Sequence, residues 1–232
     1  MQNLNDYLME NFGKPISEIS KTEYGNIVVN NESNMISFDD VAKYFNKANN
    51  EFKEEFSSAD GLIIIEKENK EKVFFFEFKN IDYSDNEDRQ MSLFHLKKCL
   101  KEMKECDNDC EVYGEINEIS KYLVDISHLS LRSKPSDSIS LLYYIMKDYY
   151  EKNDTTEMCI KKLFEAEKFF FLVSKTESQY IPFKNKSNRQ NNIIQPLSFL
   201  KRFEPYHYKM VLAVNKDGFD RYFYKRNEKY LN

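Results

Sequence analysis

Two apolar runs, Gly61–Ile65 and Val73–Phe78, stand out in the pattern of hydrophobic and polar positions along the chain. Both are rich in β-branched or aromatic residues, and a charged segment separates them. Two short apolar runs joined by a polar connection predict an antiparallel β-hairpin. Alternate positions are apolar on both sides of each strand, which is typical of central strands and not of exposed edges.

Segments with the helical spacing of apolar residues precede and follow this hairpin in the sequence. Ser37 has the character of an N-cap, with Asp39 and Asp40 in the first turn of the helix that follows it. Helices are predicted over 3–12, from Ser37 to residue 48 or 56, and over 84–104, 136–150, 156–167 and 219 onward; further strands are predicted over 169–175 and 208–215. Strands mixed with helices in this order predict an α/β domain with a central mixed sheet flanked by helices and a mostly helical C-terminal elaboration. We expect residues 1–232 to form one domain.

The hairpin places charged residues at the end of apolar strands. With a turn centred on Asn69 and Lys70, Asp60 faces Lys79 and Leu62 faces Glu77. Because opposed residues point to one side and side chains alternate along a strand, Asp60, Glu77 and Lys79 share a face. Charged groups at the end of buried strands lose hydration unless they pair with one another or bind a metal. The three residues are therefore a candidate site.

The residue types indicate a chemistry for this site. Asp60 and Glu77 supply hard oxygen ligands suited to Mg²⁺ or Mn²⁺. Such an ion polarises a phosphoryl oxygen and lowers the pKa of a bound water. Lys79 is placed to orient that water or to stabilise charge that develops on a phosphate.

The same residues resemble the signature of the PD-(D/E)xK nuclease superfamily. That signature is an acid at the start of one strand, a hairpin, and Glu/Asp-x-Lys on the next strand; here it is Ala59-Asp60 and Glu77-Phe78-Lys79, with alanine in place of the proline. The helix expected next is at 84–104, and its Gln90–Phe94 segment resembles the Gln-x-x-x-Tyr element of RecB-like members. The resemblance covers residues 38–104. It implies a restriction-endonuclease-like fold and a metal-dependent nuclease acting in defence or DNA processing.

Alternatives to catalysis stay open. Glu77 and Lys79 could form an ordinary ion pair at a strand end, in a non-catalytic nuclease-fold module that binds nucleic acid or a protein. Members of the superfamily often carry a further upstream acid, and nothing in the sequence selects among the candidates Glu51, Glu54 and Glu55.

A basic segment over 183–209 contrasts with the acidic remainder of the chain. Its candidate phosphate-binding residues are Lys184, Lys186, Arg189, Lys201 and Arg202, and Tyr206 and Tyr208 could stack on bases. The segment is equally compatible with a solvated connection. If it binds nucleic acid, the nuclease resemblance favours DNA over RNA.

Two further clusters contain residue types that bind phosphate or metal ions. Arg132 and Lys134 lie beside a predicted helix N-terminus, which favours phosphate binding, although a plain capped loop explains the segment better. His95 and the cysteines Cys99, Cys106 and Cys110 have the spacing of no common metal site.

Composition limits the remaining function classes. The formal net charge of −5 argues against a protein that coats nucleic acid without specificity. The chain has neither the pattern of a signal peptide nor an apolar run long enough to cross a bilayer, so a cytoplasmic protein without membrane contact is expected. A homodimer is compatible with the resemblance.

Overall fold

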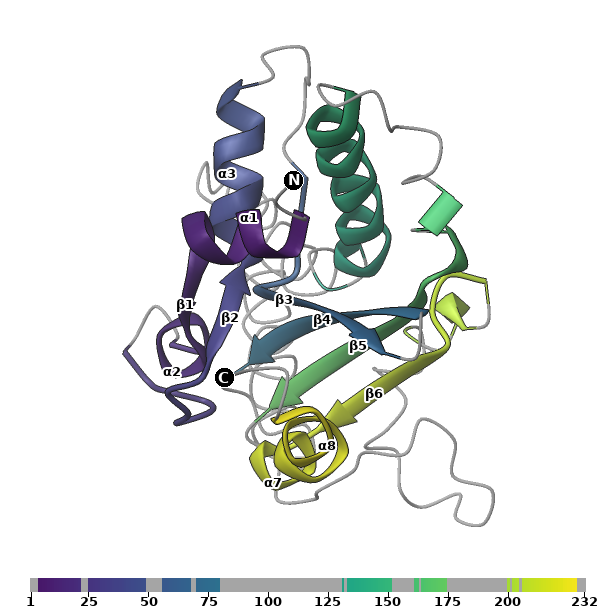
Figure 1. Cartoon of the computed structure of the whole chain (residues 1–232). Helices are drawn as coiled ribbons and strands as arrows, with labels where there is room; N and C mark the ends of the chain where they lie inside the picture. Colours follow the sequence, from purple (N-terminus) through teal and green to yellow (C-terminus); the bar gives the residue numbers. More distant parts are fainter. Residues whose placement is uncertain are drawn as a thin grey trace, which may run out of the picture.

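A six-stranded mixed sheet organises the chain in a computed structural model, which describes residues 4–21, 25–48, 56–67, 70–79, 131, 133–151, 161–162, 164–174, 200, 202–204 and 206–228 (Figure 1). The strands lie in the order of the sequence: β1 (Gly13–Pro15), β2 (Asn34–Ser37), β3 (Gly61–Lys67), β4 (Lys70–Lys79), β5 (Glu167–Ser174) and β6 (Met210–Val214). Strands β1 to β4 pair antiparallel, and β4, β5 and β6 pair parallel. The carboxyl ends of β4, β5 and β6 therefore lie at one edge of the sheet.

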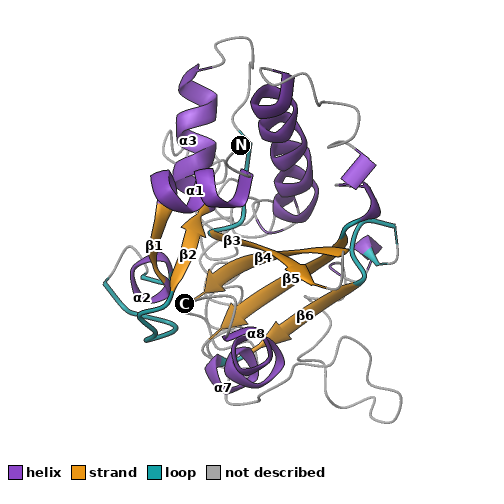
Figure 2. Ribbon diagram, viewed as in Figure 1, coloured by secondary structure: helices purple, strands orange, loops and turns teal. Residues whose placement is uncertain are grey.

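Helices cover both faces of this sheet (Figure 2). One face carries α1 (Leu4–Phe12), α3 (Phe38–Ala48) and a helix over 133–151. The other carries α2 (Ile16–Ile19) and a continuous helical segment made of α7 (Lys216–Phe219), the π-helical η2 (Asp220–Tyr224) and α8 (Lys225–Asn227). The prediction of an α/β fold with a mixed sheet flanked by helices is confirmed.

The hairpin of β3 and β4 forms with a register different from the expected one. Lys67 pairs with Lys70, and Gly61 pairs with Phe76, so the reversal is centred one residue earlier than predicted. Every pair is consequently displaced by two positions, and the expected pairings of Asp60 with Lys79 and of Leu62 with Glu77 are wrong. Because side chains alternate with a period of two, this displacement leaves each residue on the face that was predicted for it.

Strand β4 is central, as its apolar pattern predicted. Val73 and Phe75 join the core beneath α1, α3 and helix 133–151. Phe74, Phe76 and Phe78 join the opposite core, under α7 and η2. Phe76 is fully buried, and its ring centroid lies 4.7 Å from that of Phe223 and 5.4 Å from that of Phe171. Aromatic packing on one side of β4 thus leaves the other side of its carboxyl end for Glu77 and Lys79.

Several element boundaries differ from the expectation. The strands β1 and β2 were not predicted, because each is only 3 or 4 residues long and too short to show alternation. Helix α3 follows β2 directly, and the hydroxyl of Ser37, which precedes the helix, donates a hydrogen bond to Asp40 Oδ2 in its first turn (2.7 Å). The second half of the chain supplies β5 and β6 to the same sheet, beside β4. The predicted helix over 84–104 lies outside the described residues.

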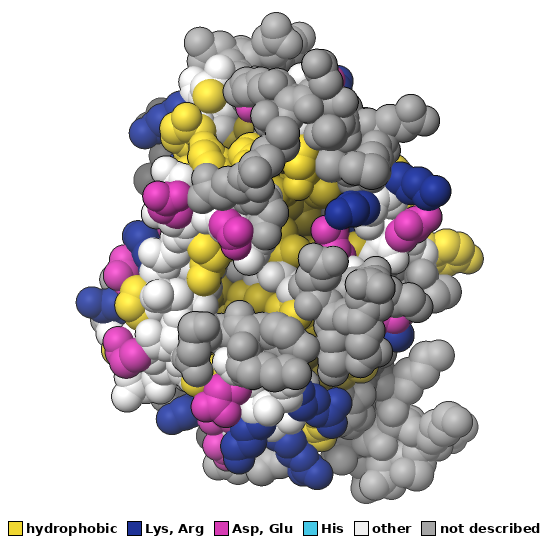
Figure 3. Space-filling model, viewed as in Figure 1, with side chains coloured by type: hydrophobic (Ala, Val, Ile, Leu, Met, Phe, Trp, Pro, Cys, Tyr) yellow, Lys and Arg dark blue, Asp and Glu magenta, His cyan; other side chains and the backbone are white. Residues whose placement is uncertain are grey.

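An apolar cavity of about 240 Å³ separates α1, α3 and helix 133–151. Its lining includes Tyr7, Phe12, Tyr44 and Ile145, with Asp148 as an acidic member. Figure 3 shows apolar side chains gathered in a hollow over these elements. Asp60 and Glu77 do not line this cavity, so it is separate from the candidate site.

Within the described part of the chain, no helix has both the length and the apolar character needed to cross a membrane.

Burial of Phe76 predicts a large effect on stability. Replacement by alanine (Phe76→Ala) should lower the free energy of unfolding by about 3–5 kcal/mol, because a buried ring is replaced by a cavity. The matched control is Phe164→Ala. Because Phe164 is 74% exposed, this substitution should change the free energy of unfolding by less than about 0.5 kcal/mol. Chemical denaturation measures both, and equal effects would contradict the assigned packing.

Candidate active site

Asp60, Glu77 and Lys79 come together at the carboxyl end of β4. Asp60 immediately precedes β3, and extending the β3–β4 register by one pair places it opposite Glu77. Asp60 Oδ2 accepts a hydrogen bond from the backbone N–H of Phe78 (2.6 Å), which fixes the carboxylate against β4. Lys79 Nζ lies 2.7 Å from Glu77 Oε1. The prediction that these three side chains share one face of the hairpin is confirmed.

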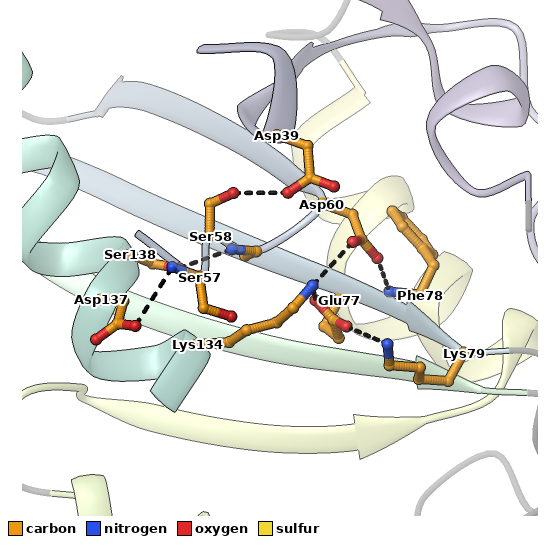
Figure 4. Close-up of polar contacts among 11 residues, drawn as sticks. Asp39, Ser57, Ser58, Asp60, Glu77, Phe78, Lys79, Lys134, Asp137 and Ser138 are labelled. Atoms are coloured by element: carbon orange, nitrogen blue, oxygen red, sulfur yellow. Dashed lines mark hydrogen bonds and ion pairs between the residues drawn. The ribbon is translucent and has the colours of Figure 1, made fainter. Parts of the chain in front are cut away.

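A fourth charged residue, Lys134, enters the site from helix 133–151. Its Nζ lies 2.7 Å from Glu77 Oε2 and 3.2 Å from Asp60 Oδ1, so one ammonium group bridges both carboxylates (Figure 4). Glu77 is fully buried, and the Lys134 side chain is only 11% exposed. The two lysines thus give the buried Glu77 carboxylate a positive partner at each oxygen, and Asp60 shares the Lys134 ammonium with it.

The segment 57–60 that carries Asp60 is held between two helices. Ser58 Oγ donates a hydrogen bond to Asp39 Oδ1 (2.6 Å), in the first turn of α3. On the other side, the N–H of Ala59 donates to Ser138 Oγ (2.8 Å), and that of Ser57 donates to Asp137 Oδ2 (3.3 Å). Figure 4 shows these contacts around Asp60 and Lys134. Backbone and side-chain hydrogen bonds therefore fix the position of Asp60 without any ligand.

Burial and neighbouring charges shift the pKa values of the acids and of the lysine at this site. Loss of hydration is the main cause that raises the pKa of Asp60 from 3.8 to about 6, and the neighbouring Glu77 carboxylate adds to it; Lys134 and the Phe78 N–H act in the opposite direction. Burial also raises the pKa of Asp39, with a contribution from Asp60. The nearby carboxylates raise the pKa of Lys134 in spite of its burial, so its ammonium stays charged. The group is a coupled set of acids around a permanent cation.

Two buried oxygen atoms at this site have no hydrogen-bond donor or acceptor among the described residues: Glu77 Oε1 and Ser174 Oγ. Glu77 Oε1 does have an ion-pair contact with Lys79 Nζ, at 2.7 Å. Ser174, the last residue of β5, is 1% exposed and pairs with Lys79 in the parallel register, so it lies on the same face as Glu77. Buried polar atoms without a partner are uncommon in proteins and mark positions where a ligand can bind.

The donor set fits a hard divalent cation in part. Asp60 Oδ1 and Glu77 Oε2 point at a single cationic nitrogen, and both are carboxylate oxygens of the kind that bind Mg²⁺ or Mn²⁺. No group of three His, Cys, Asp or Glu side chains is arranged around one metal position in the described ranges. Mg²⁺ is commonly held by one or two carboxylates, with water and phosphate oxygens completing its shell. Two carboxylates therefore suffice, provided that Lys134 Nζ leaves the position between them.

Of the predicted nucleic-acid-binding residues, Arg202 lies within the described ranges. Lys184, Lys186, Arg189 and Lys201 lie outside the described residues, as do the upstream acids Glu51, Glu54 and Glu55 and the thiols Cys99, Cys106 and Cys110. Arg202 is exposed and lies over the ring of Phe203, near the amino end of β6. Lys79 ends β4, which runs parallel to β5 and β6, so Arg202 is at the opposite end of the sheet.

Tyr208 does not have the role that the sequence suggested. It is buried, and its hydroxyl donates a hydrogen bond to the carbonyl of Pro135 (2.6 Å), so it cannot stack on a base. Tyr206 is 87% exposed and remains available for such a contact. The buried Tyr208 instead ties the segment before β6 to the start of helix 133–151.

Lys134 and Ser174 were missed as members of the site. Lys134, Asp137 and Ser138 have the i, i+3, i+4 spacing that places side chains on one helical face, and all three contact the Asp60 segment or its partner Glu77. That spacing was visible in the sequence, but the helix was expected to start only at Ser136 or Asp137. No sequence pattern identifies Ser174 as a member of the site, because its place beside Lys79 depends on how β4 and β5 pair.

The raised pKa of Asp60 predicts a specific dependence of stability on pH. The folded protein holds this proton more tightly than the unfolded chain, so the contribution of Asp60 is complete below 3.8 and is lost as the pH rises through about 6. Relative to Asp60→Asn, which has no proton to lose, the wild-type free energy of unfolding should fall by up to about 3 kcal/mol between about pH 4 and 7. Urea denaturation across this range measures the difference, and parallel curves for the two proteins would contradict it.

Comparison of the chain with protein-family models, with curated proteins and with solved structures finds no match.

Proposed function

We propose that the protein is a metal-dependent nuclease with a restriction-endonuclease-like fold, which hydrolyses phosphodiester bonds of nucleic acid at Asp60, Glu77 and Lys79. The observation that carries the proposal is the convergence of Asp60 Oδ1 and Glu77 Oε2 on one cationic nitrogen, at 3.2 and 2.7 Å. The order of these residues, an acid before β3 and Glu-x-Lys at the end of β4, supports it, because this order is the one that resembles PD-(D/E)xK nucleases.

The place of the site in the sheet also supports the proposal. Ligands of open α/β sheets bind beyond the carboxyl ends of the strands, and Lys79 and Ser174 are the last residues of two adjacent parallel strands. The Lys79 side chain is 30% exposed, whereas Glu77 behind it is fully buried. A phosphate can therefore reach Lys79 from solvent while the carboxylates stay in a region of low dielectric constant.

Each residue has a role in this proposal. Asp60 and Glu77 hold the metal ion, which when bound polarises a phosphoryl oxygen and makes a coordinated water more acidic. The Phe78 N–H keeps Asp60 in place, and its hydrogen bond lowers the pKa of that carboxyl toward its ordinary value. The Lys79 ammonium, beside Glu77 at the open edge, stabilises negative charge as it develops on the phosphate. DNA is the proposed substrate, and Arg202 is the described member of the proposed phosphate-binding segment.

A non-catalytic nuclease-fold module is the second candidate function. The observation that favours it is Lys134, whose ammonium already satisfies both carboxylates without a metal ion. Such a module would bind nucleic acid or a protein and would use Asp60, Glu77 and Lys134 only to hold β3, β4 and helix 133–151 together.

Metal titration separates the two candidates. If the protein is a nuclease, Mn²⁺ should bind to the wild type in calorimetry, and supercoiled plasmid or single-stranded oligonucleotides should be cleaved at the same Mn²⁺ concentration. Asp60→Asn should abolish both, because one of the two carboxylate ligands is lost, while the exposed control Asp217→Asn should keep both. A wild type that neither binds Mn²⁺ nor cleaves either substrate would refute the nuclease.

Replacement of Lys79 tests its proposed role in turnover. Lys79→Ala should reduce the cleavage rate by about 10²–10³-fold, because a positive charge at the developing phosphate charge is removed. Mn²⁺ should bind at least as tightly as in the wild type, since Lys79 is not a ligand and its positive charge no longer opposes the ion. The control is Lys72→Ala, on the same strand and with a side chain of equal exposure (29%), which pairs with Glu167 at the other end of β4. If the two substitutions change the cleavage rate equally, the ion pair of Lys79 with Glu77 is purely structural.

A further inference from the structure

The nuclease proposal does not explain why Lys134 lies between the two carboxylates. Its Nζ contacts the same two oxygens, Asp60 Oδ1 and Glu77 Oε2, that the proposed metal ion requires. Two cations cannot share a position that small. Either the metal ion never binds there, or Lys134 leaves when it does.

The anchoring of Lys134 allows the side chain to leave without unfolding of the helix. Its neighbour Pro135 accepts the hydrogen bond of the buried Tyr208 hydroxyl, and Asp137 and Ser138 hold the backbone of residues 57 and 59. The backbone of the helix start is thereby fixed by contacts that do not involve the ammonium. The lysine side chain is a flexible four-carbon arm, so its charge can move while these contacts persist.

The charges of the site are balanced comparably with either cation. Asp39, Asp60 and Glu77 contribute three acids, against the ammonium groups of Lys79 and Lys134. A buried carboxylate that loses its partner is strongly unfavourable, which explains why a cation is needed between Asp60 and Glu77 when no metal ion is present. A divalent ion that replaces the Lys134 ammonium would meet the same need.

We propose that Lys134 is a tethered counter-cation of the Asp60–Glu77 site, which occupies the metal position in the metal-free protein and is displaced when a divalent ion binds. This inference rests on the proposed function, since it names Lys134 as the group that competes with the metal ion for the proposed site. It gives Lys134 a different role from Lys79, whose ion pair among the described residues is with Glu77 and which stays beside the bound ion.

Calorimetric titration of Mn²⁺ into the full chain tests the competition. Lys134→Met keeps the length of the side chain and removes the charge, and it should raise the Mn²⁺ affinity about tenfold or more, because contacts of the ammonium with two carboxylates no longer have to be broken. Without Mn²⁺ its melting temperature should fall, and Mn²⁺ should raise it by more than in the wild type. Lys79→Met, the matched control, removes an equal charge from the same carboxylate and should raise the affinity less.

A second measurement on the wild type decides the question where Lys134→Met does not fold. An amine-reactive ester followed by mass spectrometry reports how fast each lysine is acylated. Lys134 should react slowly without Mn²⁺ and faster with it, whereas Lys43, whose side chain is 70% exposed, should be unaffected and serves as the internal reference. An unchanged rate at Lys134 at a Mn²⁺ concentration that saturates the wild type would overturn the proposal.

The outcomes separate this inference from the nuclease proposal. Wild type that binds Mn²⁺ and cleaves, with Lys134→Met binding no tighter than wild type or Lys79→Met, overturns the counter-cation alone. Wild type without measurable Mn²⁺ binding, together with Lys134→Met that binds it, supports the counter-cation and refutes the native metal site. Binding by neither protein overturns both.

Discussion

A fully buried carboxylate on the central strand, that of Glu77, is the constraint on which the arrangement of this site depends. Glu77 follows four apolar or aromatic residues on β4, where the loss of its hydration has to be offset by positive partners. One partner, Lys79, is two residues along the same strand, and the other, Lys134, comes from a helix 57 positions away in the sequence. The need to neutralise one side chain thus connects β4 with helix 133–151.

The connection extends to the residue that precedes β3. Asp60 shares the Lys134 ammonium with Glu77, and its own strand entry is held by α3 through Asp39 and by helix 133–151 through Ser138. Three elements that are distant in sequence therefore meet at one end of the hairpin. Hydrogen bonds hold their meeting point, and the buried Ser174 hydroxyl beside it has no hydrogen-bond partner among the described residues. Such a fixed arrangement of charged groups is what the proposed site requires.

The two faces of β4 differ in character: one packs aromatic rings, and the other carries the charged residues of the site. Stacked and edge-on aromatic rings fill the side under η2, where Phe74 and Phe76 contact Phe171 and Phe223. Phe78 contacts Phe219 on the same side. That packing supplies stability and no chemistry. The other side is aliphatic and aromatic up to Phe75 and becomes charged at Glu77, so the change from core to site happens within two residues. Charges at the end of an otherwise apolar strand are shielded from water on the side of the core and open to it at the edge.

The sequence by itself determined the hairpin, the central place of β4 and the common face of Asp60, Glu77 and Lys79. It did so because these features depend only on alternation with a period of two, which survives a displacement of two residues in the pairing. It determined neither that register nor the strands β1 and β2, which are too short to carry a pattern. Tertiary structure alone decided that Lys134 lies between the carboxylates and that Ser174 lies beside Lys79. The physical reason is that both positions follow from the docking of distant elements, the helix over 133–151 onto one face of the sheet and β5 alongside β4, and this docking is driven by burial of apolar surface that has no local signature at either residue.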